Sequence, residues 1–238
     1  MRYNLYEEMK KTRGEDTEFG NVELSYQYTL KNLKNCKNVK AKKLLDIGTN
    51  LGTLPYLLYH RNGFDVTGVE CREDAIKKGK IKYAEIADKL FTVGPRLVNI
   101  EDNCFDIVTM FDVIEHIPGV ESYLKNDIFR ILRPGGVFIF QTPNARINPI
   151  FEAIRTKSFT AYKEYHCSLQ TPVSLRHILM ESGFVEIKIE KYTIDSEFNR
   201  KKLKKYFGPF AGLIMKGFEN VPLGLYPNLW GTAIKPNN

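Results

Sequence analysis

The sequence predicts an α/β protein built on a doubly wound, mostly parallel β-sheet. From Lys43 onward, short apolar runs alternate with longer amphipathic stretches, the pattern of strands that are each followed by a helix. The apolar runs are nearly continuous, as in strands that are buried on both faces. Strand–helix–strand units cross over with a right hand and bring their strands parallel. These observations predict a sheet with helices on both faces.

The expected elements can be placed in order along the chain. The predicted strands cover residues 43–48, 65–70, a short run before Gly94, 105–111, 137–143, 185–193 and 229–236. The predicted helices cover residues 54–63, 73–90, 121–136 and 172–182. Thr171 and Pro172 begin the last helix and Gly183 ends it, because proline is favoured in a first turn and glycine just after a last one.

The length and the 43% hydrophobic content predict one domain over residues 1–238. Residues 1–40 are expected to form an N-terminal cap, because Leu24, Tyr28 and Leu33 follow one another at helical spacing.

Two stretches fall outside the strand–helix pattern, residues 143–170 and 194–225. Structureless stretches of this length in a compact domain are usually functional, so both are candidate substrate lids. Within the second, residues 207–218 are apolar enough to touch lipid and are expected to form a helix packed on the lid.

Composition bounds the partners and the compartment. The net charge of +7 would suit an anionic partner, but lysine runs are usually solvated surfaces and no known nucleic-acid module accompanies them. No apolar run is long enough to span a membrane, and the first residues are not a signal peptide, so a cytoplasmic protein is expected. Four widely separated cysteines argue against a disulfide framework or a cysteine zinc site.

The segment LLDIGTNLG is the most informative for function. A strand ends at Ile47, turns through Gly48 and Gly52, and enters a helix whose first amides face the turn. The next strand ends in Glu70, about twenty residues after the glycine turn, where an acid can accept hydrogen bonds from two ribose hydroxyls. This spacing predicts a nucleoside cofactor at the carboxyl ends of the first two strands.

Four segments resemble class I S-adenosylmethionine-dependent methyltransferases in order and spacing. They are LLDIGTNLG, VTGVE, CFDIVTMFDVIEHIP and ILRPGGVFIFQTPN, and the resemblance covers residues of about 43–192. It implies a Rossmann-like sheet of seven strands with a final antiparallel strand. An NAD-type protein is disfavoured because the GxGxxG spacing is absent. The resemblance assigns cofactor binding to Asp46, Gly48, Asn50, Gly52, Glu70 and Asp112.

The sequence departs from the family pattern in two places. Asn50 stands where the family's middle glycine is usual, although asparagine tolerates left-handed backbone, so the turn can survive. The acid often found after the third strand, near the adenine, is replaced around Gly94 and Pro95, which leaves the adenine contacts undefined.

Asp112, Glu115 and His116 follow the fourth strand, beside the expected position of the transferred methyl group. Two interpretations stay open: they hydrogen-bond neighbouring loops and the cofactor pocket, or they bind Mg²⁺ or Mn²⁺ with His166 as a fourth ligand. The segment resembles both ubiquinone-type O-methyltransferases and small-RNA 3′-terminal 2′-O-methyltransferases. Asp112 replaces the longer glutamate usual in both.

The resemblance implies O-methylation of a small hydroxylated acceptor, such as a catechol-like ring or a glycan sugar, by in-line displacement. His116 or His166 is expected to assist deprotonation of the acceptor hydroxyl. The alternatives are 2′-O-methylation of an RNA terminus and a cofactor-binding protein that has lost catalysis. The oligomeric state is not predicted.

Overall fold

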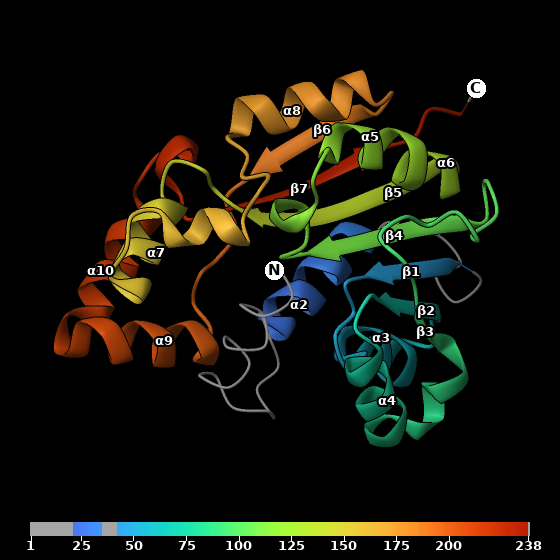
Figure 1. Cartoon of the computed structure of the whole chain (residues 1–238), viewed down its shortest axis with the longest axis horizontal. Coiled ribbons are helices and arrows are strands. Elements are labelled where there is room, and N and C mark those ends of the chain that lie inside the picture. The colour runs from blue at the N-terminus through green and yellow to red at the C-terminus, as the bar shows by residue number, and fades with distance from the viewer. Residues whose placement is uncertain (1–20, 35–41, 238) are drawn as a thin grey trace.

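A computed structural model describes residues 21–34 and 42–237 as a seven-stranded sheet between two layers of helices (Figure 1). The strands are β1 (Lys43–Ile47), β2 (Asp65–Glu70), β3 (Leu90–Thr92), β4 (Phe105–Phe111), β5 (Leu132–Pro143), β6 (Val185–Glu190) and β7 (Asn228–Ile234). They lie in the order β3-β2-β1-β4-β5-β7-β6, and β7 is antiparallel to both of its neighbours. The predicted fold class is confirmed.

The strand order reverses direction between β1 and β4, which fixes where a ligand can bind. β1 pairs in parallel with β2 on one side and with β4 on the other. The helices that follow β1 and β4 lie on opposite faces, so a crevice opens outside the carboxyl ends of these strands. The candidate cofactor residues lie at these strand ends, except Glu70, which ends the neighbouring strand β2.

The nearly continuous apolar runs are explained by two hydrophobic cores, one on each face of the sheet. Leu45 packs with α5 (Val120–Tyr123), α6 (Phe129–Ile131) and α8 (Pro172–Glu181), whereas Leu44 packs with α2 (Val22–Leu33), α3 (Thr53–Asn62) and α4 (Glu73–Lys82). In Figure 1 the first three helices lie above the sheet and the others below it. The helix expected from Leu24 to Leu33 is α2, and the rest of the predicted N-terminal cap lies outside the described residues.

The predicted helix over 121–136 is wrong in its last part. It contains α5, a π-helical turn η4 (Leu124–Ile128) and α6, and it ends at Ile131. Leu132 is already extended, with φ −69° and ψ 139°, and begins β5. Pro134 explains the early end, because the proline ring disfavours helical backbone before it and removes a helical donor. The predicted helix over 73–90 likewise divides, into α4 and the 3₁₀ helix η2 (Ala84–Lys89).

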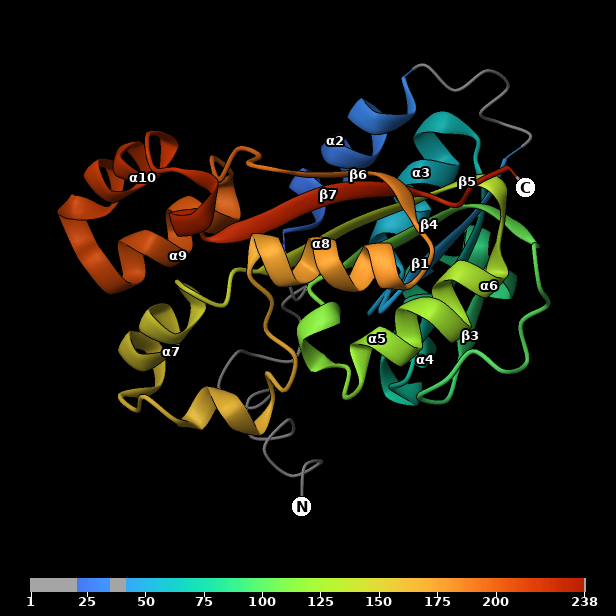
Figure 2. The ribbon, with the colours of Figure 1, turned by 90° about the horizontal axis from the view of Figure 1, so that it is seen from above.

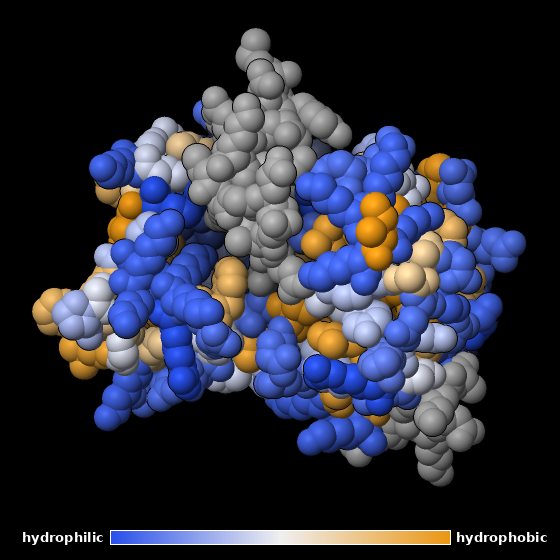
Figure 3. Space-filling view, turned by 90° about the horizontal axis from the view of Figure 1, so that it is seen from below, coloured by the Kyte–Doolittle hydropathy of each residue, from blue (hydrophilic) through white to orange (hydrophobic). Residues whose placement is uncertain are grey.

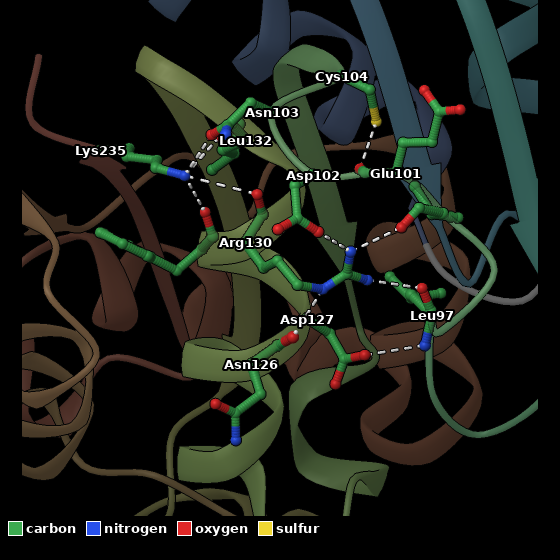
Figure 4. Close-up of polar contacts among 12 residues, drawn as sticks. Leu97, Glu101, Asp102, Asn103, Cys104, Asn126, Asp127, Arg130, Leu132 and Lys235 are labelled. Carbon is green, nitrogen blue, oxygen red and sulfur yellow. Dashed lines mark hydrogen bonds and ion pairs between the residues drawn. The ribbon is translucent and has the colours of Figure 1, made fainter.

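The loop between β3 and β4, residues 93–104, is held in place by Arg130 on α6 and by Lys235, which follows β7 (Figure 4). Arg130 donates to the carbonyls of Leu97 and Ile100 and pairs with Asp102. Lys235 donates to the carbonyls of Phe129 and Leu132 and to the side chain of Asn103. These contacts fix the course of residues 97–103, which follow Gly94 and Pro95.

The two predicted lids are helical rather than structureless. The first contains α7 (Asn148–Thr156) and η5 (Ala161–Glu164), and the second contains α9 (Glu197–Phe207), η6 (Gly208–Phe210), α10 (Ala211–Glu219) and η7 (Leu223–Leu225). Helices α7, α9 and α10 gather at one end of the sheet in both ribbon views (Figures 1 and 2). Within the described residues, no helix is long and apolar enough to cross a membrane.

Candidate functional site

A cleft opens at the carboxyl ends of β1 and β4. Its walls include the turn from Ile47 to Asn50, the end of β4 with Asp112, and the first turn of α2 with Ser25. The cleft therefore lies where the strand order reverses, as expected for a ligand site in a doubly wound sheet.

In the turn after β1, every second residue has a left-handed backbone conformation. Gly48, Asn50 and Gly52 have φ of +73°, +52° and +84°. Asn50 thus adopts the left-handed backbone expected of it. The two glycines are also required by space, because a Cβ on Gly48 would lie 2.3 Å from Val113 Cγ2 and one on Gly52 would lie 2.7 Å from Leu90 Cδ2.

Glu70 joins the ends of β1 and β2. Its Oε2 accepts a hydrogen bond from the Asn50 amide at 3.1 Å, and its Oε1 accepts one from the Arg72 amide at 3.1 Å. The Arg72 guanidinium completes the link by donating to Asn50 Oδ1 at 2.6 Å. Glu70 is buried and hydrogen-bonded to Asn50, which lines the cleft, and its Oε2 can accept a further donor. The sequence analysis missed Arg72, whose only sequence signal is its place two residues after the acid.

Asp46 is buried near the end of β1 and lines the cleft. Its Oδ1 accepts a hydrogen bond of 2.7 Å from the hydroxyl of Thr109, its partner in the register of β4. Burial raises the pKa of Asp46 to about 7, because few groups around it replace the water that would solvate its charge. A cationic ligand in the cleft would stabilise the ionised form.

Asp112 also lines the cleft. Its backbone is left-handed, with φ +54°, and its Oδ1 accepts a hydrogen bond of 2.9 Å from Gln141 Nε2. The structure therefore places Asp112 with Asp46 in the wall of the cleft, and not in the cluster of Glu115, His116 and His166.

Glu115, His116 and His166 bring ligand atoms within 4.8 Å of one another. His116 Nε2 lies 3.7 Å from Glu115 Oε1, and the two imidazole rings are 5.0 Å apart. Burial raises the pKa of Glu115 well above its ordinary value, and the charge of Asp112 raises it further. Of the four residues proposed as metal ligands, the structure thus groups three.

Hydrogen bonds select the tautomer of both rings. His116 Nδ1 lies 2.7 Å from the carbonyl oxygen of Tyr165, and His166 Nδ1 lies 2.9 Å from Asn148 Oδ1. Because both oxygens only accept, each Nδ1 carries the proton, and each neutral ring has its lone pair on Nε2. Two imidazole nitrogens that can accept a proton thereby lie next to Glu115.

A polar cluster inside the first predicted lid fixes the segment that holds these rings. Tyr165 donates through its hydroxyl to Glu152 Oε2, and Arg155 Nε donates to the same oxygen at 2.7 Å. Burial opposes ionisation of Glu152, but these hydrogen bonds outweigh it and lower the pKa of Glu152. Burial and the bond to Glu152 raise the pKa of Tyr165. Sequence reasoning missed Asn148, Glu152 and Arg155.

Comparisons with known proteins identify the family of the chain. The family model for a methyltransferase domain matches residues 23–189. The chain is 27% identical over 146 residues to a ubiquinone biosynthesis O-methyltransferase of Hydrogenovibrio crunogenus, a match that covers 59% of this chain and 58% of that protein. The chain spans about half the length of the curated relatives it matches first.

Two solved structures share the fold. A SAM-dependent methyltransferase from Archaeoglobus fulgidus is similar with a TM-score of 0.62 and 20% identity over 98% of this chain and 99% of that one. The phosphoethanolamine N-methyltransferase 2 of Haemonchus contortus, solved in complex with S-adenosyl-L-methionine, has a TM-score of 0.63 and 18% identity over 88% of this chain and 52% of that one.

Proposed function

Because the chain belongs to the methyltransferase-domain family, among the class I S-adenosylmethionine-dependent methyltransferases, we propose that it methylates a hydroxyl oxygen of a small acceptor. The observation that carries this proposal is the pair of histidines, 5.0 Å apart, whose Nδ1 hydrogen bonds leave each Nε2 as a proton acceptor. The similarity to a ubiquinone biosynthesis O-methyltransferase supports oxygen as the acceptor atom.

The chemistry of the cleft fits S-adenosylmethionine. The described residues that line it include two acids, Asp46 and Asp112, and no basic side chain, which suits a ligand with a positively charged sulfonium and ammonium. Asp46 would hold the methionine end, Asp112 would add negative charge, and Glu70 would take the ribose. When bound, the cofactor supplies a methyl group on a positively charged sulfur, already activated for displacement.

The protein's own part in the reaction is positioning and proton transfer. His116 or His166 accepts the proton of the acceptor hydroxyl on Nε2 as the new carbon–oxygen bond forms and the carbon–sulfur bond breaks. Helix α7, which lies at this end of the sheet in Figures 1 and 2, would exclude water from the site together with η5.

The proposal is tested by incubating the protein with S-adenosylmethionine and paired acceptors, a catechol series and its amine analogues, and detecting methylated products by mass spectrometry. O-methylated products are expected. Transfer only to the amines would contradict the proposal. Binding of the cofactor without transfer to any acceptor would favour a protein that has lost catalysis, and transfer only to RNA termini would favour the RNA alternative.

Metal binding by Glu115, His116 and His166 would have a different experimental result from direct base catalysis by the histidines. Glu115, His116 and His166 would supply one oxygen and two nitrogens, a set that suits Mn²⁺ better than Mg²⁺, which prefers oxygen ligands. If the histidines act directly as bases, dialysis against EDTA should leave kcat unchanged. Loss of turnover that Mn²⁺ restores would instead assign the three side chains to a metal site.

Asn148 provides a test of the tautomer argument. We expect Asn148→Asp to raise the pKa of His166, because a carboxylate beside Nδ1 stabilises the imidazolium. Since the base must be neutral to act, the acidic limb of the kcat/KM profile should move to higher pH by about one unit. Asn126→Asp, an exposed position on η4, makes the same charge change and should leave the profile in place. An identical profile in wild type and Asn148→Asp would remove His166 from the role of base.

A further inference from the structure

Helix α7 has polar side chains on its buried face and two isoleucines on its exposed face. Its buried positions include Asn148 and Glu152, whereas Ile150 and Ile154 are 55% and 45% exposed. A surface helix ordinarily buries its apolar stripe. Here the inner face is polar because Asn148 binds His166 and Glu152 binds Tyr165 and Arg155. The outer face is consequently apolar and open.

The same end of the molecule exposes three further large apolar side chains. Phe159 after α7, Phe210 on η6 and Leu213 on α10 are 80%, 65% and 71% exposed. Helices α7 and α10 pack through the rings of Phe151 and Phe218, 5.8 Å apart, so these side chains belong to neighbouring elements. Gathered exposed apolar side chains on a folded domain mark a surface that meets a partner or a membrane.

Positive charge flanks this apolar end. Residues 197–219 contain six basic and two acidic side chains, and five of the basic ones lie on α9. Seen from below, hydrophilic side chains spread over α9 and are bordered by apolar ones at the same end (Figure 3). The two acids near the start of α9, Asp195 and Glu197, are already paired with Arg200 and Lys201. Apolar side chains beside lysines are the chemistry of helices that lie in the interface of an anionic bilayer.

We propose that the end of the molecule formed by α7, η6 and α10, which we call the docking end, binds the surface of an anionic membrane with α9 at its rim. Phe159, Phe210 and Leu213 would enter the headgroup region, and the α9 lysines would meet the lipid phosphates. The inner face of α7 holds His166, so the docked helix is also a wall of the candidate site. Binding of the protein to lipid does not depend on methyl transfer, so this proposal goes beyond the proposed function.

Co-sedimentation of the full chain with phosphatidylglycerol/phosphatidylcholine vesicles tests the proposal. Binding is expected, with little binding to pure phosphatidylcholine and weakening at about 0.5 M NaCl, where charges are screened over a few ångströms. The triple variant Phe159→Ser, Phe210→Ser and Leu213→Ser should lower the partition coefficient at least about tenfold. The variant Lys204→Glu with Lys205→Glu should lower it as well.

Matched controls place equivalent changes on exposed residues elsewhere. Ile81→Ser, Val98→Ser and Met180→Ser remove three exposed apolar side chains, and Lys78→Glu with Lys80→Glu reverses two charges on α4. Both controls should bind vesicles like wild type. Thermal melting and calorimetry with S-adenosylmethionine, done on every variant, show whether the fold and the cofactor site are intact.

Three results would overturn the proposal. The first is no sedimentation with anionic vesicles, or equal loss in test and control variants. The second is a dimer in sedimentation velocity that the triple serine variant disrupts without any vesicle binding, which would assign the docking end to a second copy of the chain. The third is RNA binding lost in the double glutamate variant without any vesicle binding, which would assign α9 to nucleic acid. Retained cofactor binding in each case would leave the proposed function standing.

Discussion

Asp46→Asn is expected to weaken S-adenosylmethionine binding while it makes the cofactor-free protein more stable at pH 8. Loss of a charge-assisted contact to a cationic ligand should raise Kd about tenfold to a hundredfold, measured by calorimetry. Stability should rise because the wild type buries an ionised carboxyl at this pH, whereas asparagine buries a neutral amide of similar shape. The Thr109 hydroxyl can still donate to the amide oxygen.

The pH dependence follows from the direction of the Asp46 shift. The pKa is about 7 in the folded chain and about 3.9 in an unfolded one, so between these values the folded state holds a proton that the unfolded state has released. The stability from this group is complete below pH ~4, falls as the pH rises, and is lost above about 7. In thermal melts, the wild type should lose Tm between pH 5 and 8 relative to Asp46→Asn, by at least about 2 °C.

Asp106 provides the matched control, because it is an aspartate of the neighbouring strand with the opposite shift. Its burial is outweighed by the Lys43 amide and by Lys42 and Arg133, which lower its pKa. Asp106→Asn should therefore lower Tm at pH 8 and leave cofactor affinity unchanged. If Asp46→Asn lowered the stability at pH 8, the ionised Asp46 carboxyl would not be destabilising in the cofactor-free protein. If the variant bound the cofactor like wild type, Asp46 would not contribute to the cofactor site.

Much of the fold could be predicted because its causes are local. The apolar run at Leu44 and Leu45 predicts a strand buried on both faces, and each residue does pack in a different core. The left-handed tolerance of asparagine predicts that the turn survives at Asn50, and its φ is +52°. In each case the reason lies within a few residues of the sequence.

The remainder depends on contacts between distant residues. The pKa of Asp46 is set by burial between β1 and β4, in register with Thr109. Asp112 and Glu115 stand three residues apart, but a left-handed backbone at Asp112 sends its side chain to Gln141. The orientation of α7 could not be predicted either. Its inner face is polar because Asn148 and Glu152 bind residues of the first predicted lid, and the helical pattern alone does not show which face is buried.

Replacing the site histidines should abolish most turnover without affecting cofactor binding. We expect the double variant His116→Ala with His166→Ala to lower kcat by about 10²–10⁴, the usual contribution of general base catalysis. Neither ring lines the cofactor cleft, so the affinity for S-adenosylmethionine should stay within about twofold of wild type. Single-turnover methyl transfer and calorimetry on the same preparations measure the two effects separately.

The chain's other two histidines provide a matched control. His60 lies on the exposed surface, paired with Glu85, and His177 is exposed on α8. The double variant His60→Ala with His177→Ala therefore removes the same number of imidazoles and should turn over like wild type. Because a base is needed only while the acceptor hydroxyl is protonated, the site variant should recover part of its rate as the pH approaches the pKa of the acceptor. Undiminished turnover in the site variant at neutral pH would show that neither histidine takes the proton, and deprotonation would then have to be assigned to Glu115 or to solvent.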